Sequence, residues 1–273
     1  MRSVDTAAQD WKLMEHHTRS GDVYQKAVCE GRIGQRADSM SLLIRYSDAS
    51  GNFYAPRHRH DFEQIRISID GPMDYGGGQV SNPGWVAYFP AGAYYGPENI
   101  GNASILLIQW GEYWVSREQN KRAVDELRER GEFKNGIYSY VDAGGRTKNK
   151  DGAAAVWEQV YGRELVYPTP KYPSPILMNP EAFEWVRRDD VVSHKVMGRF
   201  TERDLVISKI RWDKAGELQL PSDRTYCVFT LSGVVRDGDS AYGPQTAVWS
   251  EYDQTDVLVG EEGAEAICMA FPA

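Results

Sequence analysis

The stretch HRHDFEQIRISIDG, residues 58–71, carries the most informative side chains of this chain. His58 and His60 lie one residue apart, so on an extended strand both imidazoles point to the same face. Gln64 and Arg66 share one face of the strand that follows, while isoleucines alternate with them on the other face. Two imidazoles that converge on one side of a sheet suit a divalent transition metal. The same two histidines also fit a polar edge strand that faces solvent, and the pair alone does not separate these alternatives.

The composition is that of a folded globular protein with much β structure. Of the 273 residues, 41% are hydrophobic and 26% are charged, which is ordinary for a globular domain. Aromatic residues reach 12%, with 16 Tyr and 8 Trp, and they favour β structure and pockets with polar rims. The formal net charge is −8 and no long basic cluster occurs, so we expect no nucleic-acid partner.

The cysteines and the N-terminal segment bear on the cellular compartment. Cys29, Cys227 and Cys268 are too few and too widely spaced for a disulfide framework, so we expect reduced thiols. The first residues lack the apolar core of a signal peptide, and no run reaches the roughly 18 apolar residues of a membrane helix. We therefore expect a cytoplasmic protein with no membrane partner.

Strand patterns fill two separate parts of the chain. Between Ser41 and Trp114, apolar runs such as SLLIRYSD, WVAYFPAG and SILLIQWGEYW are separated by turn-forming residues. Strand patterns return from about Asp204 in LVISKIRW, TYCVFTLSGVV and TDVLVG. Many short strands at this spacing predict an all-β sandwich or barrel.

The part of the chain between these two regions has a different pattern. SREQNKRAVDELRERG, residues 116–131, opens with a capping box of Ser116 and Gln119 and predicts a surface helix. A second helix is predicted over residues 151–164 from the spacing of their apolar side chains. The proline-rich residues 167–180 must be extended, because proline disfavours the helical conformation of the residue before it.

These patterns divide the chain into four parts. We expect residues 1–35 to form an N-terminal arm, and residues 36–114 to form a first β lobe that carries the candidate site. Residues 115–189 are expected to form a helical and proline-rich connector, and residues 190–273 a second β lobe. The two lobes have similar length, which suggests a duplicated unit, although the identity between them is too weak to prove duplication.

Two spaced motifs connect the first lobe to a known family. From Gly51 to Gly71 the sequence reads G-x6-H-x-H-x3-Q-x6-G, and from Gly84 to Asn99 it reads G-x5-P-x-G-x2-Y-x3-N. This pair resembles the two motifs of the cupin superfamily in its glycines, its Pro-x-Gly turn, its terminal Asn and its spacings. The resemblance covers about residues 40–112. It implies compact double-stranded β-helix (jelly-roll) barrels, arranged here as a two-lobed bicupin with a degenerate second lobe.

The resemblance also implies a metal site. In the family, the first motif supplies two histidines and a glutamate, and the second motif supplies a third histidine. Carried over position by position, it places four side chains around a divalent transition metal (Fe, Mn, Ni or Zn): His58, His60, Gln64 and Tyr95. Gln64 replaces the glutamate and Tyr95 the third histidine, which removes one formal ligand charge and leaves metal occupancy open. Glu63 is an alternative ligand, but strand alternation turns it away unless a bulge intervenes.

Arg66 is the second residue of interest on this strand. It should point into the barrel, and a buried arginine needs an anionic or acceptor partner. One interpretation is an internal ion pair with Asp61 or Asp74. The other is a clamp for a carboxylate or enolate oxygen of a substrate.

The second lobe lacks these side chains. Leu218 and Leu220 stand where the resemblance would place the two histidines, so it implies a lobe without metal. His194 is the remaining histidine near this lobe, and a lone histidine is more often structural.

Three kinds of function remain open, and all take a small molecule as partner. The first is a metal-dependent enzyme on a carboxylated or phenolic molecule, a dioxygenase rather than an isomerase or lyase, with Tyr95 and Arg66 as catalytic residues. The second is a metal-independent isomerase or lyase in which His58 or His60 is the base and Tyr95 the acid. The third is a non-catalytic protein whose barrel binds a small molecule. The sequence also leaves the oligomeric state open, and a homodimer is one arrangement that it allows.

Overall fold

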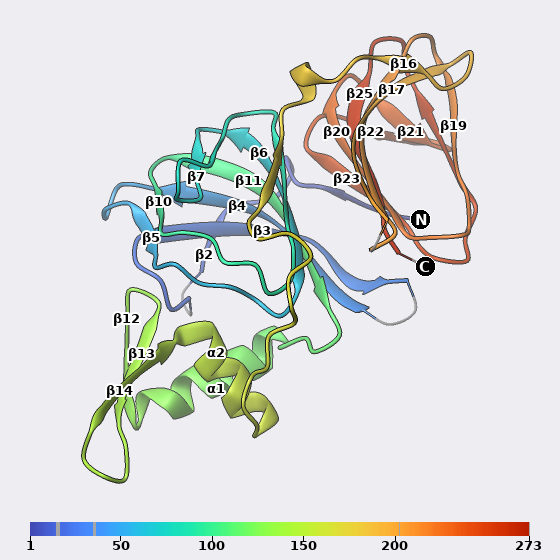
Figure 1. The fold of residues 1–273 in the computed structure, drawn as a ribbon. Coiled ribbons are helices and arrows are strands. Elements are labelled where there is room, and N and C mark those ends of the chain that lie inside the picture. The colour runs from blue at the N-terminus through green and yellow to red at the C-terminus, as the bar shows by residue number, and fades with distance from the viewer. Residues whose placement is uncertain (15–16, 35–36, 202, 273) are drawn as a thin grey trace. The chain divides into compact units, whose positions relative to one another are not determined.

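The computed structural model describes residues 1–14, 17–34, 37–201 and 203–272 (Figure 1). Within them, the chain is built of antiparallel strands with two α-helices, which confirms the prediction of an all-β fold. No helix in this described part is long and apolar enough to cross a membrane. The predicted boundary between residues 35 and 36 lies outside the described residues.

The chain forms two compact units. One, called the motif unit below, contains Trp11–Gln25 and Leu43–Leu177. The other, called the C-terminal unit, contains Met1–Asp10, Lys26–Leu42 and Met178–Ala273. The helices of the predicted connector therefore belong to the same compact unit as the two motifs.

Residues 1–35 contain strands where we expected an arm. Strand β1 (Arg2–Asp5) pairs with β23 (Thr246–Ser250), and β2 (Lys12–Leu13) pairs with β3 (Asp22–Ile33). The sequence of β3, DVYQKAVCEGRI, mixes charged and apolar residues, so its strand pattern is weak. Pairing with neighbouring strands, rather than local propensity, stabilises such a segment as a strand.

Strand β6, which carries Gln64 and Arg66 of the first motif, is an interior strand of a seven-stranded sheet of order β15-β9-β6-β11-β4-β3-β2. Its further strands are β4 (Ala37–Ser47), β6 (Glu63–Asp70), β9 (Val86–Phe89), β11 (Ala103–Gly111) and β15 (Ile176–Met178). Strand β6 pairs with β9 on one edge and β11 on the other, and both of its faces are buried over residues 63–68. Two short pairs complete the unit's barrel, β5 (Phe53–Ala55) with β10 (Glu98–Ile100), and β7 (Met73–Asp74) with β8 (Val80–Ser81).

An insertion with its own small core follows β11. Helices α1 (Arg117–Arg128) and α2 (Gly152–Tyr161) confirm both predicted helices, and Ser116 and Gln119 form the predicted capping box. Between the helices lies a three-stranded sheet that the sequence analysis missed: β12 (Gly131–Lys134), β13 (Ile137–Val141) and β14 (Thr147–Asp151). Strands β12 (GEFK) and β14 (TKNKD) are short and charged and give little apolar alternation, so only the five residues of β13 (IYSYV) have a strand pattern. Val124 and Leu127 of α1 pack with Tyr138 of β13 and Val156 of α2.

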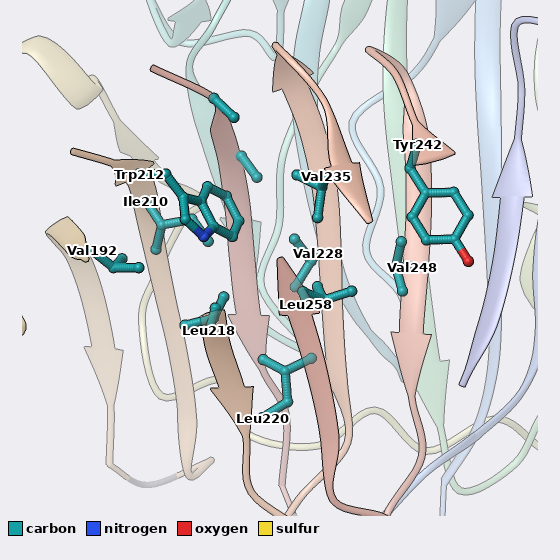
Figure 2. Close-up of a cluster of buried hydrophobic side chains, with 12 residues drawn as sticks. Val192, Ile210, Trp212, Leu218, Leu220, Val228, Val235, Tyr242, Val248 and Leu258 are labelled. Atoms are coloured by element: carbon teal, nitrogen blue, oxygen red, sulfur yellow. The ribbon is translucent and has the colours of Figure 1, made fainter. Parts of the chain in front are cut away.

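The C-terminal unit contains a seven-stranded sheet of order β1-β23-β20-β25-β18-β17-β16 and a four-stranded sheet of order β19-β24-β21-β22. A short 3-10 helix, η1 (Pro180–Ala182), precedes β16. Besides β1 and β23, the strands are β16 (Val186–Arg187), β17 (Val192–Phe200), β18 (Leu205–Trp212), β19 (Gly216–Leu220), β20 (Tyr226–Ser232), β21 (Val235–Asp237), β22 (Ser240–Tyr242), β24 (Asp256–Gly260) and β25 (Glu265–Ala270). Leu218 and Leu220 lie in a buried hydrophobic cluster with Trp212 and Leu258 (Figure 2). These positions therefore serve the core of the unit.

Candidate functional site

Backbone hydrogen bonds join the two motifs. His58 N donates to Tyr95 O at 2.9 Å and Tyr95 N donates to His58 O at 3.0 Å, which forms an isolated antiparallel bridge. Gly92 N donates to His60 O at 2.7 Å. Gly92 has a φ of +80°, and a Cβ there would lie 2.0 Å from Pro168 O, so this turn requires glycine.

The two imidazoles lie side by side next to the tyrosine. The ring centroids of His58 and His60 are 5.0 Å apart, and the ring of Tyr95 lies 4.4 Å from His58 and 6.1 Å from His60. His58 and Tyr95 are buried and His60 is partly buried. The structure thus brings together the histidines and the tyrosine that the sequence analysis selected.

Gln64 connects Tyr95 to the rest of strand β6. Its Nε2 donates to Tyr95 Oη at 3.1 Å, and its Oε1 accepts from Gln109 Nε2 at 3.1 Å. Arg66 Nη2 donates both to Tyr95 Oη at 3.0 Å and to Gln64 Oε1 at 3.3 Å. The guanidinium therefore lies within hydrogen-bond distance of both oxygens that were expected to ligate a metal.

The partner of Arg66 is Glu98, and the predicted partners Asp61 and Asp74 were wrong. Arg66 Nη1 donates to Glu98 Oε1 at 2.5 Å, and both side chains are buried. Asp74 instead accepts a hydrogen bond from its own turn, at Gly76 N. Glu98 was missed, although it lies beside the terminal Asn99 of the second motif, and alternation on β10 turns it inward together with Ile100.

Glu63 does not reach the site. Its Oε2 accepts from Tyr88 Oη at 2.6 Å and from Ala91 N at 3.2 Å. Glu63 and Gln64 pair in normal register with Trp110 and Gln109 of β11, so no bulge turns Glu63 inward. The alternative in which Glu63 serves as a ligand is therefore wrong.

Burial sets the protonation states of the site. It lowers the pKa of His58, with Arg19 acting in the same direction, and it lowers the pKa of His60 well below its usual value, helped by His58. Burial also raises the pKa of Tyr95 to about 12, against the opposing effect of Arg66. At neutral pH the two imidazoles are uncharged and the phenol keeps its proton.

The donor set does not fit a four-ligand metal site as it is arranged. Both candidate oxygens, on Gln64 and Tyr95, already accept hydrogen bonds from the guanidinium of Arg66, and a dication beside them would meet that buried positive charge. Within the described ranges, no group of three or more His, Cys, Asp or Glu side chains could hold a metal ion. The nearest acidic group is Glu98, whose Oε2 lies 3.9 Å from His58 Nε2 and whose Oε1 is paired with Arg66.

A pocket of about 410 Å³ borders the site within the motif unit. Arg57, His58, Arg59 and Tyr94 line it from the two motifs. The other walls come from β13, β14 and α2 of the insertion and from the segment after α2. Its volume lies within the roughly 300–1,000 Å³ of small-ligand sites, and His58 connects it to the buried polar cluster.

Comparison with known proteins identifies the fold. No protein-family model and no curated protein matches the sequence. A candidate dioxygenase from Nostoc punctiforme has a TM-score of 0.63 at 12% identity, over 98% of this chain and 81% of that chain. HEPD from Streptomyces albus, solved with 2-hydroxyethylphosphonate and Fe(II) bound, has a TM-score of 0.56 at 12% identity, over 100% of this chain and 76% of that chain. An oxalate decarboxylase variant from Bacillus subtilis has a TM-score of 0.52 at 11% identity, over 98% of this chain and 76% of that chain.

These solved structures are cupin-fold proteins, and the similarity shows that this chain has the cupin fold. The fold implied by the two sequence motifs is thereby confirmed. Because cupin barrels support many chemistries, the similarity defines the fold and leaves the reaction to the site.

Proposed function

We propose that this chain is a cupin enzyme of the isomerase or lyase type that acts on a small carboxylated or phenolic molecule without a tightly held metal. The observation that carries the proposal is an uncharged imidazole, His58, whose ring lies 4.4 Å from a protonated phenol, Tyr95, with a buried guanidinium beside the phenol. A base and an acid in one site are what proton transfer between two positions of a substrate requires.

His58 is the proposed base because its tautomer follows from one hydrogen bond. Its Nδ1 lies 2.7 Å from Pro56 O, and a carbonyl oxygen only accepts, so Nδ1 carries the proton. The neutral ring then has its lone pair on Nε2. The low pKa keeps this form available at and below neutral pH.

Tyr95 is the proposed acid because its oxygen receives two hydrogen bonds. Gln64 Nε2 and Arg66 Nη2 both donate to it, which leaves its own O–H proton for a third partner. In the proposed step, His58 takes a proton from the substrate and Tyr95 gives one to a substrate oxygen. The phenolate that forms is stabilised by Arg66. In an isomerase, His58 then gives its proton to a second substrate carbon and the phenolate takes back the proton of the substrate oxygen. In a lyase, the protonated oxygen leaves with the product and the proton on His58 passes to the phenolate, so neither reaction needs a co-reactant.

A metal-dependent enzyme is the second candidate, favoured by two uncharged imidazoles with ring centroids 5.0 Å apart. Imidazole suits Fe, Mn, Ni and Zn, and such an ion would polarise a substrate oxygen or activate dioxygen. His58 and His60 would hold it, whereas Gln64 and Tyr95 would have to leave Arg66 first.

Elemental analysis combined with an activity screen tests the proposal. Protein purified without chelator or added metals should contain well below one metal ion per chain, and should turn over a member of a carboxylate and phenol panel after chelation. His58→Ala should abolish this turnover, while His194→Ala, a matched change on β17, should retain it. Stoichiometric metal, with activity lost on chelation and restored by one ion, would instead establish the second candidate. Binding of panel members with no turnover in either state would identify a non-catalytic binding protein.

A further inference from the structure

Two arginines stack on tyrosine rings at the wall of the pocket. Arg57 Cζ lies 4.5 Å from the ring centroid of Tyr94, and Arg59 Cζ lies 4.6 Å from the same centroid. Arg59 Cζ also lies 4.1 Å from the ring of Tyr167. Stacking holds the planar guanidinium groups in place while leaving their N–H donors available at the ring edge.

Arg59 is half-buried and Arg57 is exposed, whereas the other half-buried charges of the pocket are already paired. Lys150 forms an ion pair with Glu158, and Asp151 forms one with Arg19 at 3.6 Å. Asp151 Oδ1 also accepts from two backbone amides at the start of α2. These groups therefore add little net charge for a ligand to meet.

Arg57 and Arg59 have no such partner. Among the described residues, neither forms an ion pair, and the remaining acidic side chain of the pocket is Glu164, which is exposed. The lining side chains carry equal numbers of positive and negative charges, and Arg19, which pairs with Asp151 from outside the lining, brings the net charge around the pocket to +1. A guanidinium matches the two oxygens of a carboxylate with two parallel hydrogen bonds.

We infer that this pocket is an anion-binding subsite in which Arg57 and Arg59 hold a carboxylate of an organic acid, with the rest of the molecule directed toward His58. The net charge favours a monoanionic carboxylate over a phosphate dianion. This inference deepens the proposed function, on which the role of the bound acid as substrate rests, whereas the binding itself does not depend on turnover.

Titration calorimetry with para-hydroxybenzoate as the probe tests the inference. Wild-type protein should bind the probe, and Arg59→Gln should weaken binding about 10-fold or more, since a charge-assisted bidentate contact is lost. The double variant Arg57→Gln/Arg59→Gln should bind more weakly still. Rising salt should weaken wild-type binding, because one partner of the contact is charged.

Arg163→Gln is the matched control. Arg163 is exposed and stacks on Tyr113 at 4.8 Å and on Trp157 at 5.0 Å, but it does not line the pocket. Its replacement should leave the affinity for para-hydroxybenzoate unchanged. The neutral amide para-hydroxybenzamide should bind at least about 10-fold more weakly than the acid, because it lacks the charge.

Several outcomes would overturn the inference. These are equal affinity for wild type and the folded double variant, equal affinity for the acid and the amide, or preference for inorganic phosphate over the acid. Circular dichroism of each variant establishes that it is folded. Arginine-dependent binding without turnover would refute the proposed function and support the subsite. Turnover that does not change when both arginines are replaced would support the proposed function and refute the subsite.

Discussion

Gln64 holds the oxygens of the site in place without adding charge. Its amide nitrogen donates to Tyr95, and its amide oxygen accepts from Arg66 and from Gln109. As an amide it has no acid or base function, so proton transfer is left to its neighbours. A carboxylate at this position would compete with Glu98 for the guanidinium and would place two negative groups in one buried pocket.

We therefore predict opposite effects of Gln64→Glu on two kinds of ligand. Affinity for Mn²⁺ or Zn²⁺ should rise, because a carboxylate is the better ligand for a dication. Affinity for para-hydroxybenzoate should fall, because like charges then share the site. Titration calorimetry measures both, with Asn120→Asp on α1 as a control that adds the same charge elsewhere. Unchanged or stronger binding of the acid would mean that Gln64 is a packing residue.

At the scale of elements, the ion pair between Arg66 and Glu98 links β6 to β10, two strands that do not pair with each other. Both groups are buried, so each depends on the other to offset the loss of hydration. The bridge between His58 and Tyr95 joins the segments next to these strands. The contacts of the site therefore also hold the two motifs together.

Glu98→Gln should lower the free energy of unfolding by about 3–5 kcal/mol, because it leaves a buried guanidinium without its counter-charge. Replacing both partners, in Arg66→Met/Glu98→Leu, should cost less than the single change. Asp190→Asn breaks an exposed ion pair with Arg187 and should cost less than about 1 kcal/mol. Urea unfolding measures all three, and equal losses for Glu98→Gln and Asp190→Asn would contradict the role of the buried pair.

The stability of helix α1 depends on the capping box at its first turn. Ser116 Oγ accepts from Gln119 N at 3.2 Å, and Gln119 Oε1 accepts from Ser116 N at 2.9 Å. Ser116→Ala should destabilise the helix by about 0.5–2 kcal/mol and speed hydrogen exchange in its first turn. Arg117→Ala changes the next, exposed position and keeps both capping bonds, so it serves as the control. Equal exchange in Ser116→Ala and wild type would show that the cap is not needed.

For the whole molecule, the buried imidazoles couple stability to pH. The pKa values of His58 and His60 are lowered in the folded state, while in the unfolded chain they return to about 6.5. Below that pH the unfolded chain binds more protons than the folded one, so stability falls as the pH is lowered. The stability that these two groups contribute is fully present above about pH 6.5.

We predict that the free energy of unfolding decreases between about pH 7 and pH 5, and that His58→Gln/His60→Gln makes this decrease smaller. Asp61 has a raised pKa and acts in the opposite direction, but it is present in both proteins and cancels in the difference. Denaturant unfolding at several pH values gives the two slopes. Identical slopes would mean that neither imidazole is held uncharged by the fold.

Sequence patterns alone predict the fold class, the two helices and the side chains of the site other than Glu98. These features are local or periodic. Alternation on β6 places Gln64 and Glu63 on opposite faces of the strand, and a capping box at Ser116 starts α1. The spacing of the motifs then brought His58 and Tyr95 together, because each motif folds as a strand and a turn of set length.

The contacts among these side chains depend on long-range packing. Arg66 meets Glu98 rather than Asp61 or Asp74, because barrel closure brings β10 opposite β6. That contact places a guanidinium at the oxygens of Gln64 and Tyr95, where the sequence motifs implied a metal. Part of the pocket wall comes from an insertion whose sheet was not predicted. Distances between segments far apart in the chain follow from packing, which local patterns do not encode.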